Sequence, residues 1–262
     1  MDTRDYLSEY YNAYDEDGRL LTQHGQVEYL TTMTYIARYL RPGVRILEIG
    51  AGTGRYSHAL ARQGYAVDAV ELVQRNVDLF RQNTLPGESV SIRQGNALNL
   101  SCFSDETYDL VLILGPMYHL YTREEQRQAL SEAVRVAKCG GVIFAAYCMS
   151  DASILQYGFA RDNIHELIAQ HKLDPETFET FSRPQDLFEL YRKEDIDALR
   201  SSLPVSPLHF VAADGYACHM REKLAQMTED VFALYLRYHL ATCERPDLIG
   251  YSNHTLDIFR KR

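Results

Sequence analysis

Short apolar runs alternate with helical patterns from residue 44 to residue 147, and this alternation constrains the fold more than any other feature of the chain. The runs "VRILEI", "YAVDAVE", "SVSIRQG", "YDLVLILG" and "GGVIFAAY" are typical of strands, and helical spacing of apolar residues fills the gaps between them. Strands that are apolar at consecutive positions belong in a parallel sheet covered by helices on both faces. The pattern therefore predicts an α/β fold with a doubly wound sheet.

The remaining residues extend the same sheet. Residues 208–213 and 254–259 read as two further strands, and helical patterns cover 5–14, 27–40, 154–171 and a long amphipathic stretch at 219–240. We expect one domain over residues 1–262, because the terminal strands complete the same sheet. Its parts are a helical lid (1–40), a core (41–149), a helical insertion (150–192) and a C-terminal part of the sheet (193–262) with its own helical insertion (214–253).

Charge and cysteine usage exclude several classes of protein. A formal net charge of −9 disfavours a nucleic acid as the main partner. The five cysteines form no C-x-x-C pair, so we expect neither a disulfide framework nor a metal site. The chain has no run of about 18 apolar residues and begins with the polar stretch "MDTRDYLSEYY", which favours a cytoplasmic protein without a membrane segment.

A glycine-rich turn, "EIGAGTG", follows the first predicted strand. Such a turn could hold a dinucleotide, a nucleoside triphosphate or S-adenosylmethionine. A dinucleotide loop needs a third glycine where this chain has Arg55, and a phosphate-binding P-loop needs a Gly-Lys-Ser/Thr end that is missing here. The turn is therefore not built for a pyrophosphate.

Acidic and amide residues near the turn indicate a cationic ligand. Glu48 would repel a pyrophosphate but attract the ammonium and sulfonium of S-adenosylmethionine. Glu71 follows the second strand, about 20 residues after Gly50, where a carboxylate can accept both ribose hydroxyls. After the third strand, Asn96 and the backbone N–H of Ala97 are placed to bind adenine.

These elements, in this order, resemble the class I S-adenosylmethionine-dependent methyltransferases. "LEIGAGTG" is similar to their first motif, Glu71 to their ribose acid, "GNAL" to their adenine loop and "LGPMYHL" to their fourth motif. "RVAKCGGVIF" is similar to the entry of their fifth strand, with Cys139 where relatives commonly have proline. The resemblance implies a seven-stranded Rossmann-like sheet whose last strand is antiparallel, with S-adenosylmethionine as cofactor and S-adenosylhomocysteine as product.

We assign candidate site residues by their place after the strands. The expected cofactor-binding residues are Glu48, Gly50, Ala51, Gly52, Thr53, Gly54, Tyr56, Glu71, Leu72, Asn96, Ala97, Leu114 and Gly115. In a doubly wound sheet the residues after the fourth strand lie beside the reacting group. His119 is therefore a candidate general base, and Tyr118 a candidate for orienting the acceptor. The alternative is that both begin the next helix and touch no substrate.

The two insertions leave the sheet at the edge expected to bind the cofactor. We predict that they and the N-terminal tyrosine helix roof an acceptor pocket. Expected substrate-binding residues are Tyr11, Tyr14, Arg19, His24, Met117 and His254; helix packing, loop polarity and strand capping are the competing explanations. A roofed pocket favours a methyltransferase acting on a small molecule. An RNA or protein methyltransferase, or a non-catalytic S-adenosylmethionine-binding regulatory protein, remains the alternative.

Overall fold

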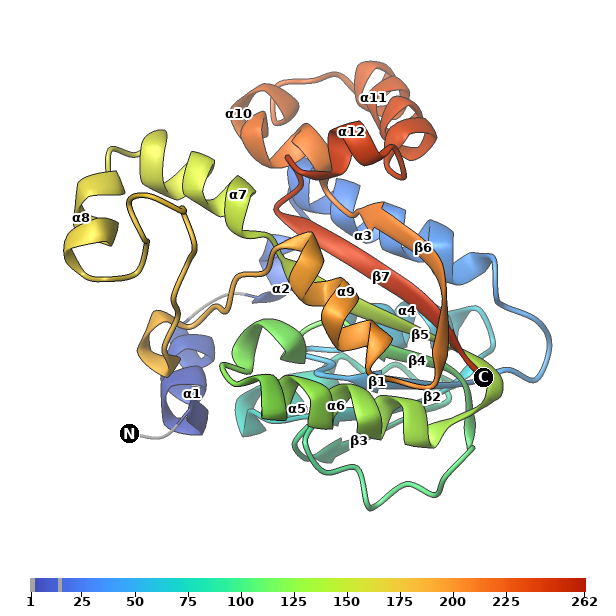
Figure 1. The fold of residues 1–262 in the computed structure, drawn as a ribbon. Helices are drawn as coiled ribbons and strands as arrows, with labels where there is room; N and C mark the ends of the chain where they lie inside the picture. The colour runs from blue at the N-terminus through green and yellow to red at the C-terminus, as the bar shows by residue number, and fades with distance from the viewer. Residues whose placement is uncertain (1–2, 14–15) are drawn as a thin grey trace.

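The computed structural model describes residues 3–13 and 16–262, and a seven-stranded sheet forms its centre (Figure 1). The strands are β1 (Arg45–Ile49), β2 (Ala66–Glu71), β3 (Val90–Gln94), β4 (Tyr108–Ile113), β5 (Ala137–Cys148), β6 (Val205–Ala212) and β7 (His254–Lys261). All seven lie where the apolar runs predict them.

Strand order in the sheet is β3-β2-β1-β4-β5-β7-β6. Strands β1 to β5 pair in parallel, whereas β7 runs antiparallel to both β5 and β6. The expected Rossmann-like sheet with a reversed last strand is thus confirmed. Strand order reverses between β1 and β4, and this switch point is where an open α/β sheet forms its ligand crevice.

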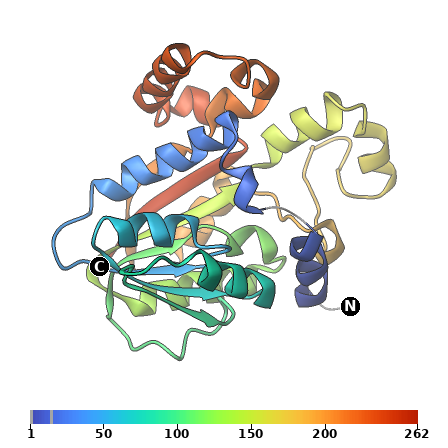
Figure 2. The same ribbon diagram turned by 180° about the vertical axis from the view of Figure 1, so that it is seen from behind.

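Helices cover both faces of the sheet (Figures 1 and 2). One face carries α3 (Gln23–Ala37), α4 (Arg55–Arg62) and α5 (Gln74–Asn83), and the other carries α6 (Arg123–Val136) and α9 (Lys193–Ser201). The remaining helical elements are α1 (Thr3–Ala13), α2 (Glu16–Arg19), α7 (Ser150–Ser153), α8 (Ile164–Ala169), α10 (Arg221–Leu224), α11 (Glu229–Thr242) and α12 (Pro246–Ile249), with η1 (Pro116–His119), η2 (Ile154–Phe159), η3 (Pro184–Asp186) and η4 (Gly215–His219).

Two apolar clusters, one on each face of the sheet, make up most of the core. Leu47 and Ile49 of β1 face the α6 side, and Ile46 faces the α3 side. One charged pair is buried among them: Arg200 of α9 donates to Asp257 of β7, whose side chain is completely inaccessible. Burial raises the pKa of Asp257 to about 6, with Arg200 acting against that rise.

Two predicted helices are wrong in their extent. The stretch 219–240 is broken because Thr228 takes an extended conformation and acts as the N-cap of α11, with Glu229 and Asp230 in the favourable first turn. The stretch 154–171 is broken after η2, where Asp162 has a positive φ of 57°. The helix predicted over 27–40 instead begins earlier in the chain. Helix α3 begins at Gln23 because the Thr22 side chain accepts a hydrogen bond from the backbone N–H of Gly25.

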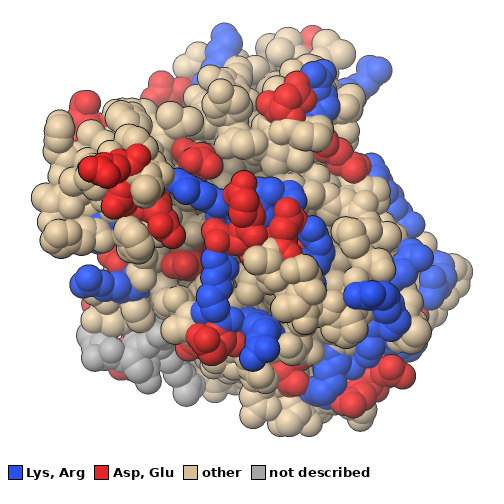
Figure 3. All heavy atoms as spheres, in the orientation of Figure 1, with Lys and Arg blue, Asp and Glu red and all other residues tan. Residues whose placement is uncertain are grey.

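The helices α1, α7 and α8 lie beyond the carboxyl ends of the parallel strands (Figure 1). Acidic and basic side chains are interspersed on the face shown in Figure 3. Among the described residues, no helix combines the length and apolar character that crossing a bilayer requires.

Candidate active site

The glycine turn after β1 adopts a backbone that only glycine accepts readily. Gly50, Gly52 and Gly54 have φ values of 74°, 53° and 94°. A Cβ on Gly50 would lie 2.6 Å from Cδ of Pro116, which follows β4. The turn therefore packs directly on the start of η1 and brings the ends of β1 and β4 together.

Glu71 closes the turn from the end of β2. Its carboxylate accepts hydrogen bonds from the backbone N–H of Gly52 and of Val73, both at 2.9 Å, and from the side chain of Asn76 at 3.4 Å. Burial raises the pKa of Glu71, although these hydrogen bonds favour the charged form. The carboxylate is thus held in one orientation at the base of the turn.

Glu48 is a buried carboxyl group at the end of β1. The backbone N–H of Ser57, 3.0 Å away, and the Ser57 hydroxyl both donate to Oε2 of Glu48. Burial raises the pKa of Glu48 to about 8 and Glu71 adds to this rise, while the Ser57 hydrogen bonds oppose it. A cationic ligand placed beside Glu48 would lower this pKa again.

One pocket joins the ends of β1 to β4 with the N-terminal helices. Twelve of the thirteen expected cofactor-binding residues line it, and so do Tyr118 and His119 and three of the six expected acceptor residues, Tyr11, Arg19 and His254. The adenine loop forms as a tight turn in which Asn96 Oδ1 accepts from the backbone of Leu98 at 3.0 Å. The carboxylates and backbone groups that line the pocket thus lie at the carboxyl ends of β1 to β4.

Three expected site residues lie outside this pocket. Gly54 caps α4, where the absence of a Cβ leaves room for His58 and Phe80 at 2.5 to 2.6 Å. Met117 is fully buried in the core, because the 3-10 turn η1 directs its side chain inward. His24 lies on α3, where its Nδ1 is 3.1 Å from the Thr22 hydroxyl. Tyr14 lies outside the described residues.

His119 is held between two polar groups on the wall of the pocket. Its Nδ1 lies 2.7 Å from the carbonyl oxygen of Leu187, which can only accept, so Nδ1 carries the proton. Its Nε2 then accepts from the Tyr11 hydroxyl at 2.9 Å. Burial lowers the pKa of His119 to about 4, with the Leu187 hydrogen bond opposing the shift. The ring is therefore neutral at physiological pH and keeps the Tyr11 hydroxyl in place.

The segment 150–192 supports this wall from outside. Phe188 packs on the His119 ring with centroids 5.4 Å apart, and it also contacts Tyr10 and Tyr118. Neither 150–192 nor 214–253 contributes a lining residue to the pocket, whereas Leu7 and Tyr11 of α1 do. The insertions thus leave the sheet at the expected edge, but among the described residues it is the N-terminal helices that cover the pocket.

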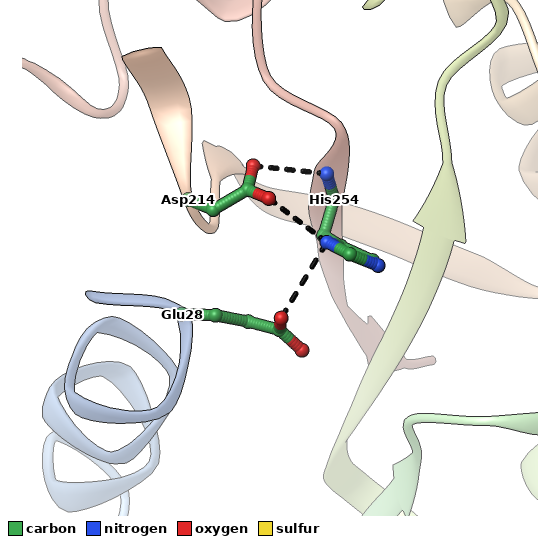
Figure 4. Close-up of side chains that lie close together, drawn as sticks. All are labelled: Glu28, Asp214 and His254. Atoms are coloured by element: carbon green, nitrogen blue, oxygen red, sulfur yellow. Dashed lines mark hydrogen bonds and ion pairs between the residues drawn. The ribbon is translucent and has the colours of Figure 1, made fainter. Parts of the chain in front are cut away.

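A charged cluster lies at the far end of the same pocket (Figure 4). His254 Nδ1 is 2.9 Å from Asp214 Oδ2 and 3.4 Å from Glu28 Oε2, and Arg19 donates to both carboxylate oxygens of Glu28 at 2.7 and 3.3 Å. The sequence analysis missed Glu28 and Asp214. Asp214 lies two residues after β6 at the carboxyl edge of the sheet, a position from which the sequence could have predicted it. Glu28 lies within a helix and offers no comparable signal.

The cluster also has the composition of a metal site. One ligand atom from each of Glu28, Asp214 and His254 falls within 4.8 Å of the others. A metal ion would have to displace the Arg19 guanidinium from Glu28 and the proton from Nδ1 of His254. The hydrogen-bond pattern therefore describes an ion-pair network.

A Rossmann-like sheet with a reversed last strand, a glycine turn and an acid after β2 defines the class I methyltransferase fold. In agreement, residues 46–141 match the methyltransferase domain family. The chain is 29% identical over 150 residues to a demethylmenaquinone methyltransferase of Clavibacter sepedonicus, an alignment that covers 56% of this chain and 59% of that protein. It is 27% identical over 189 residues to a ubiquinone biosynthesis O-methyltransferase of Methylocella silvestris, covering 71% of this chain and 70% of that protein.

Solved structures share the fold over the whole chain. The N-methyltransferase NodS from Bradyrhizobium japonicum, in complex with S-adenosylhomocysteine, superposes with a TM-score of 0.61 at 15% identity, covering 99% of both chains. Over residues 46–141 this chain thus resembles the methyltransferase domain family, and the whole chain has the fold of the class I S-adenosylmethionine-dependent methyltransferases, which supports S-adenosylmethionine as its cofactor.

Proposed function

We propose that the protein transfers the methyl group of S-adenosylmethionine to a small molecule. Both would bind in the pocket described above, beside the charged cluster shown in Figure 4. The donor would lie across the ends of β1 to β4. The residues proposed to hold it are Glu48, Gly50, Ala51, Gly52, Thr53, Tyr56, Glu71, Leu72, Asn96, Ala97, Leu114 and Gly115. In this arrangement Glu71 accepts from the ribose hydroxyls and Glu48 faces the ammonium.

The close approach of backbone at the switch point supports the fit of this donor. A Cβ on Gly115 would lie 3.3 Å from the carbonyl oxygen of Gly50, so two glycines face each other where the methyl-bearing sulfur would sit. Backbone carbonyls and two carboxylates are suited to an ammonium and a sulfonium, and none of these groups would bind a phosphate.

The observation that carries the proposal is that donor and acceptor residues share one pocket. The Gly50 turn and Glu71 line the same cavity as Tyr11, His119 and His254. Methyl transfer from a sulfonium is an in-line displacement, so the protein must chiefly position the acceptor and exclude water. We assign Tyr11 to acceptor binding and His119 to holding the Tyr11 hydroxyl, since a histidine with a pKa of about 4 is a weak general base.

Charge and relatives support a small acceptor over a nucleic acid. The net charge is −9, and basic and acidic side chains are interspersed on the face in Figure 3. The Clavibacter protein is named a demethylmenaquinone methyltransferase and the Methylocella protein a ubiquinone biosynthesis O-methyltransferase, and both names favour a small-molecule acceptor. A non-catalytic S-adenosylmethionine-binding protein is the second candidate, because the donor residues alone do not require turnover.

A binding and product assay tests the proposal. Wild-type protein should bind S-adenosylhomocysteine and transfer labelled methyl groups from S-adenosylmethionine into a pool of cellular metabolites. Glu71→Gln should weaken binding by roughly ten- to hundredfold, the value of a charge-assisted hydrogen-bond pair. Asp78→Asn, an exposed acid on α5, is the matched control. Lack of binding would refute the methyltransferase assignment, and binding without any product would favour the non-catalytic alternative.

A further inference from the structure

The acids of the charged cluster direct their oxygens at donors within the protein. Asp214 Oδ1 accepts from the Ser252 hydroxyl at 2.7 Å and from the backbone of His254 at 3.0 Å, and Oδ2 faces His254 Nδ1. Both oxygens of Glu28 accept from Arg19. The carboxylates of both acids are thus directed at donors of the protein itself.

His254, in contrast, has a ring nitrogen that can donate a hydrogen bond to a ligand in the pocket. Its Nδ1 is directed at the two carboxylates, and its second ring nitrogen, Nε2, points away from both (Figure 4). Nε2 has no hydrogen-bond partner among residues 3–13 and 16–262, and the side chain keeps 19% of its surface exposed while lining the pocket. A histidine whose Nδ1 proton is bound by carboxylates can donate from Nε2 when it is protonated.

The charges around His254 favour the protonated ring. Burial alone would lower the pKa of His254, but Glu28, Cys148 and Asp214 outweigh it and raise that pKa well above its usual value. Arg19 is the cation nearest to this network and is paired with Glu28. The ring therefore carries a positive charge at neutral pH and shows the pocket an N–H donor.

Strand order places the His254 N–H group on the side of the pocket where we expect the methyl acceptor. The glycine turn, Glu71 and Asn96 follow β1, β2 and β3, which lie on one side of β4. His254 begins β7, two strands beyond β4 on the other side, and it pairs with Cys148 at the end of β5. S-adenosylmethionine lying across the ends of β1 to β4 would leave the region above β5 and β7 to the second substrate.

We propose that His254 Nε2–H, backed by Asp214 and Glu28, binds an anionic oxygen of the methyl acceptor. This inference rests on the proposed function and narrows it to acceptors with a carboxylate or an acidic, ionised hydroxyl group. Amine acceptors would meet a positive charge here. The amino-acid carboxylate of S-adenosylmethionine has the same chemistry, so the test must separate the two sources.

Histidine NMR on the full-length protein provides the test. Protein with labelled histidine Cε1 is first loaded with S-adenosylhomocysteine, and benzoate and phenylacetate are then titrated against their amides and amines. We expect at least one acid to bind and shift the His254 signal, with the matched amine failing to bind. His254→Gln should weaken acid binding by roughly ten- to hundredfold, whereas His209→Gln, which removes a histidine paired with Glu244, should not.

Further measurements assign each result. His254→Gln should leave the affinity for S-adenosylhomocysteine unchanged; a loss there without acid binding would mean that the ring holds the donor's carboxylate, which overturns the proposal. Failure of every acid, or preference for the amines, would also overturn it. If His254→Gln does not fold, the wild-type signal decides, since acid affinity must fall as pH rises through the His254 pKa. Failure of S-adenosylhomocysteine itself to bind would instead refute the proposed function.

Discussion

Replacing Glu48 with glutamine should change how the affinity for S-adenosylhomocysteine depends on pH. Burial raises the pKa of Glu48 to about 8 in the ligand-free protein, so at pH 7 most molecules carry a neutral carboxyl group there. The α-amino group of the ligand lies beside a free carboxylate, which keeps its pKa above that of a peptide N-terminus, so it is an ammonium from pH 6 to pH 8. In the complex the two groups hold each other in their charged forms, so only the doubly ionised pair binds well.

The magnitude follows from the pKa of Glu48. With this pKa at about 8, Glu48 is ionised in about half of the molecules at pH 8 and in about 1% at pH 6. The affinity should therefore fall about 50-fold, or about 2.3 kcal/mol, between pH 8 and pH 6. Binding releases a proton from Glu48 over this range.

Calorimetry in two buffers of different ionisation enthalpy measures both the affinity and the proton exchange. Wild-type protein should bind more tightly as the pH rises from 6 to 8, with proton release from Glu48 over that range. Glu48→Gln should lose both the pH dependence of the affinity and the proton release, while Asp78→Asn should keep both. An affinity that stays constant from pH 6 to pH 8 in the wild type, or the same pH dependence in Glu48→Gln, would refute the reasoning.

Three further predictions concern the turn, the pocket wall and the core. Gly50→Ala should lower the melting temperature more than Gly87→Ala, because both residues have positive φ but only the first would place a Cβ against the proline after β4; equal effects would contradict this. The His119 ring signal should not titrate between pH 5 and pH 9, given a pKa of about 4, and a transition near pH 6.5 would show that the ring is solvated in the pocket wall. Arg200→Met should cost about 3 to 5 kcal/mol of unfolding free energy in urea, since it leaves a buried carboxylate on β7 without its partner, whereas Arg245→Met, which removes an exposed pair, should leave the unfolding free energy nearly unchanged.

Local sequence patterns were enough to predict the cofactor-binding part of the site. The glycine turn and Glu71 are each separated from the end of a predicted strand by at most a few residues, so the strand prediction alone brings them to one edge. Gly54 and Met117 show the limit of this reasoning. Both stand in the correct motif, but the direction of a Cβ in a cap or a 3-10 turn depends on what packs against it.

The spacing of apolar residues also failed to predict where two of the helices are interrupted. The apolar spacing of 219–240 suits one long helix, yet Thr228 caps a new helix there, and Asp162 interrupts the other insertion with a positive φ. Periodicity reports which face of a segment is apolar, and it does not report whether the segment turns between two apolar stretches.

The sequence by itself determined the strands and the kind of methyl donor, because these depend on residues close together in the chain, and the family resemblance added the reversal of the last strand. Only the tertiary structure decided what faces the acceptor. Glu28 and His254 come from opposite ends of the chain and meet because α3 packs beside β7, where Asp214 joins them. Tertiary packing likewise brings Tyr11 of α1 to His119 of η1, and burial there lowers the pKa of His119. The charge on each ring depends on the groups packed around it, and no local pattern specifies those.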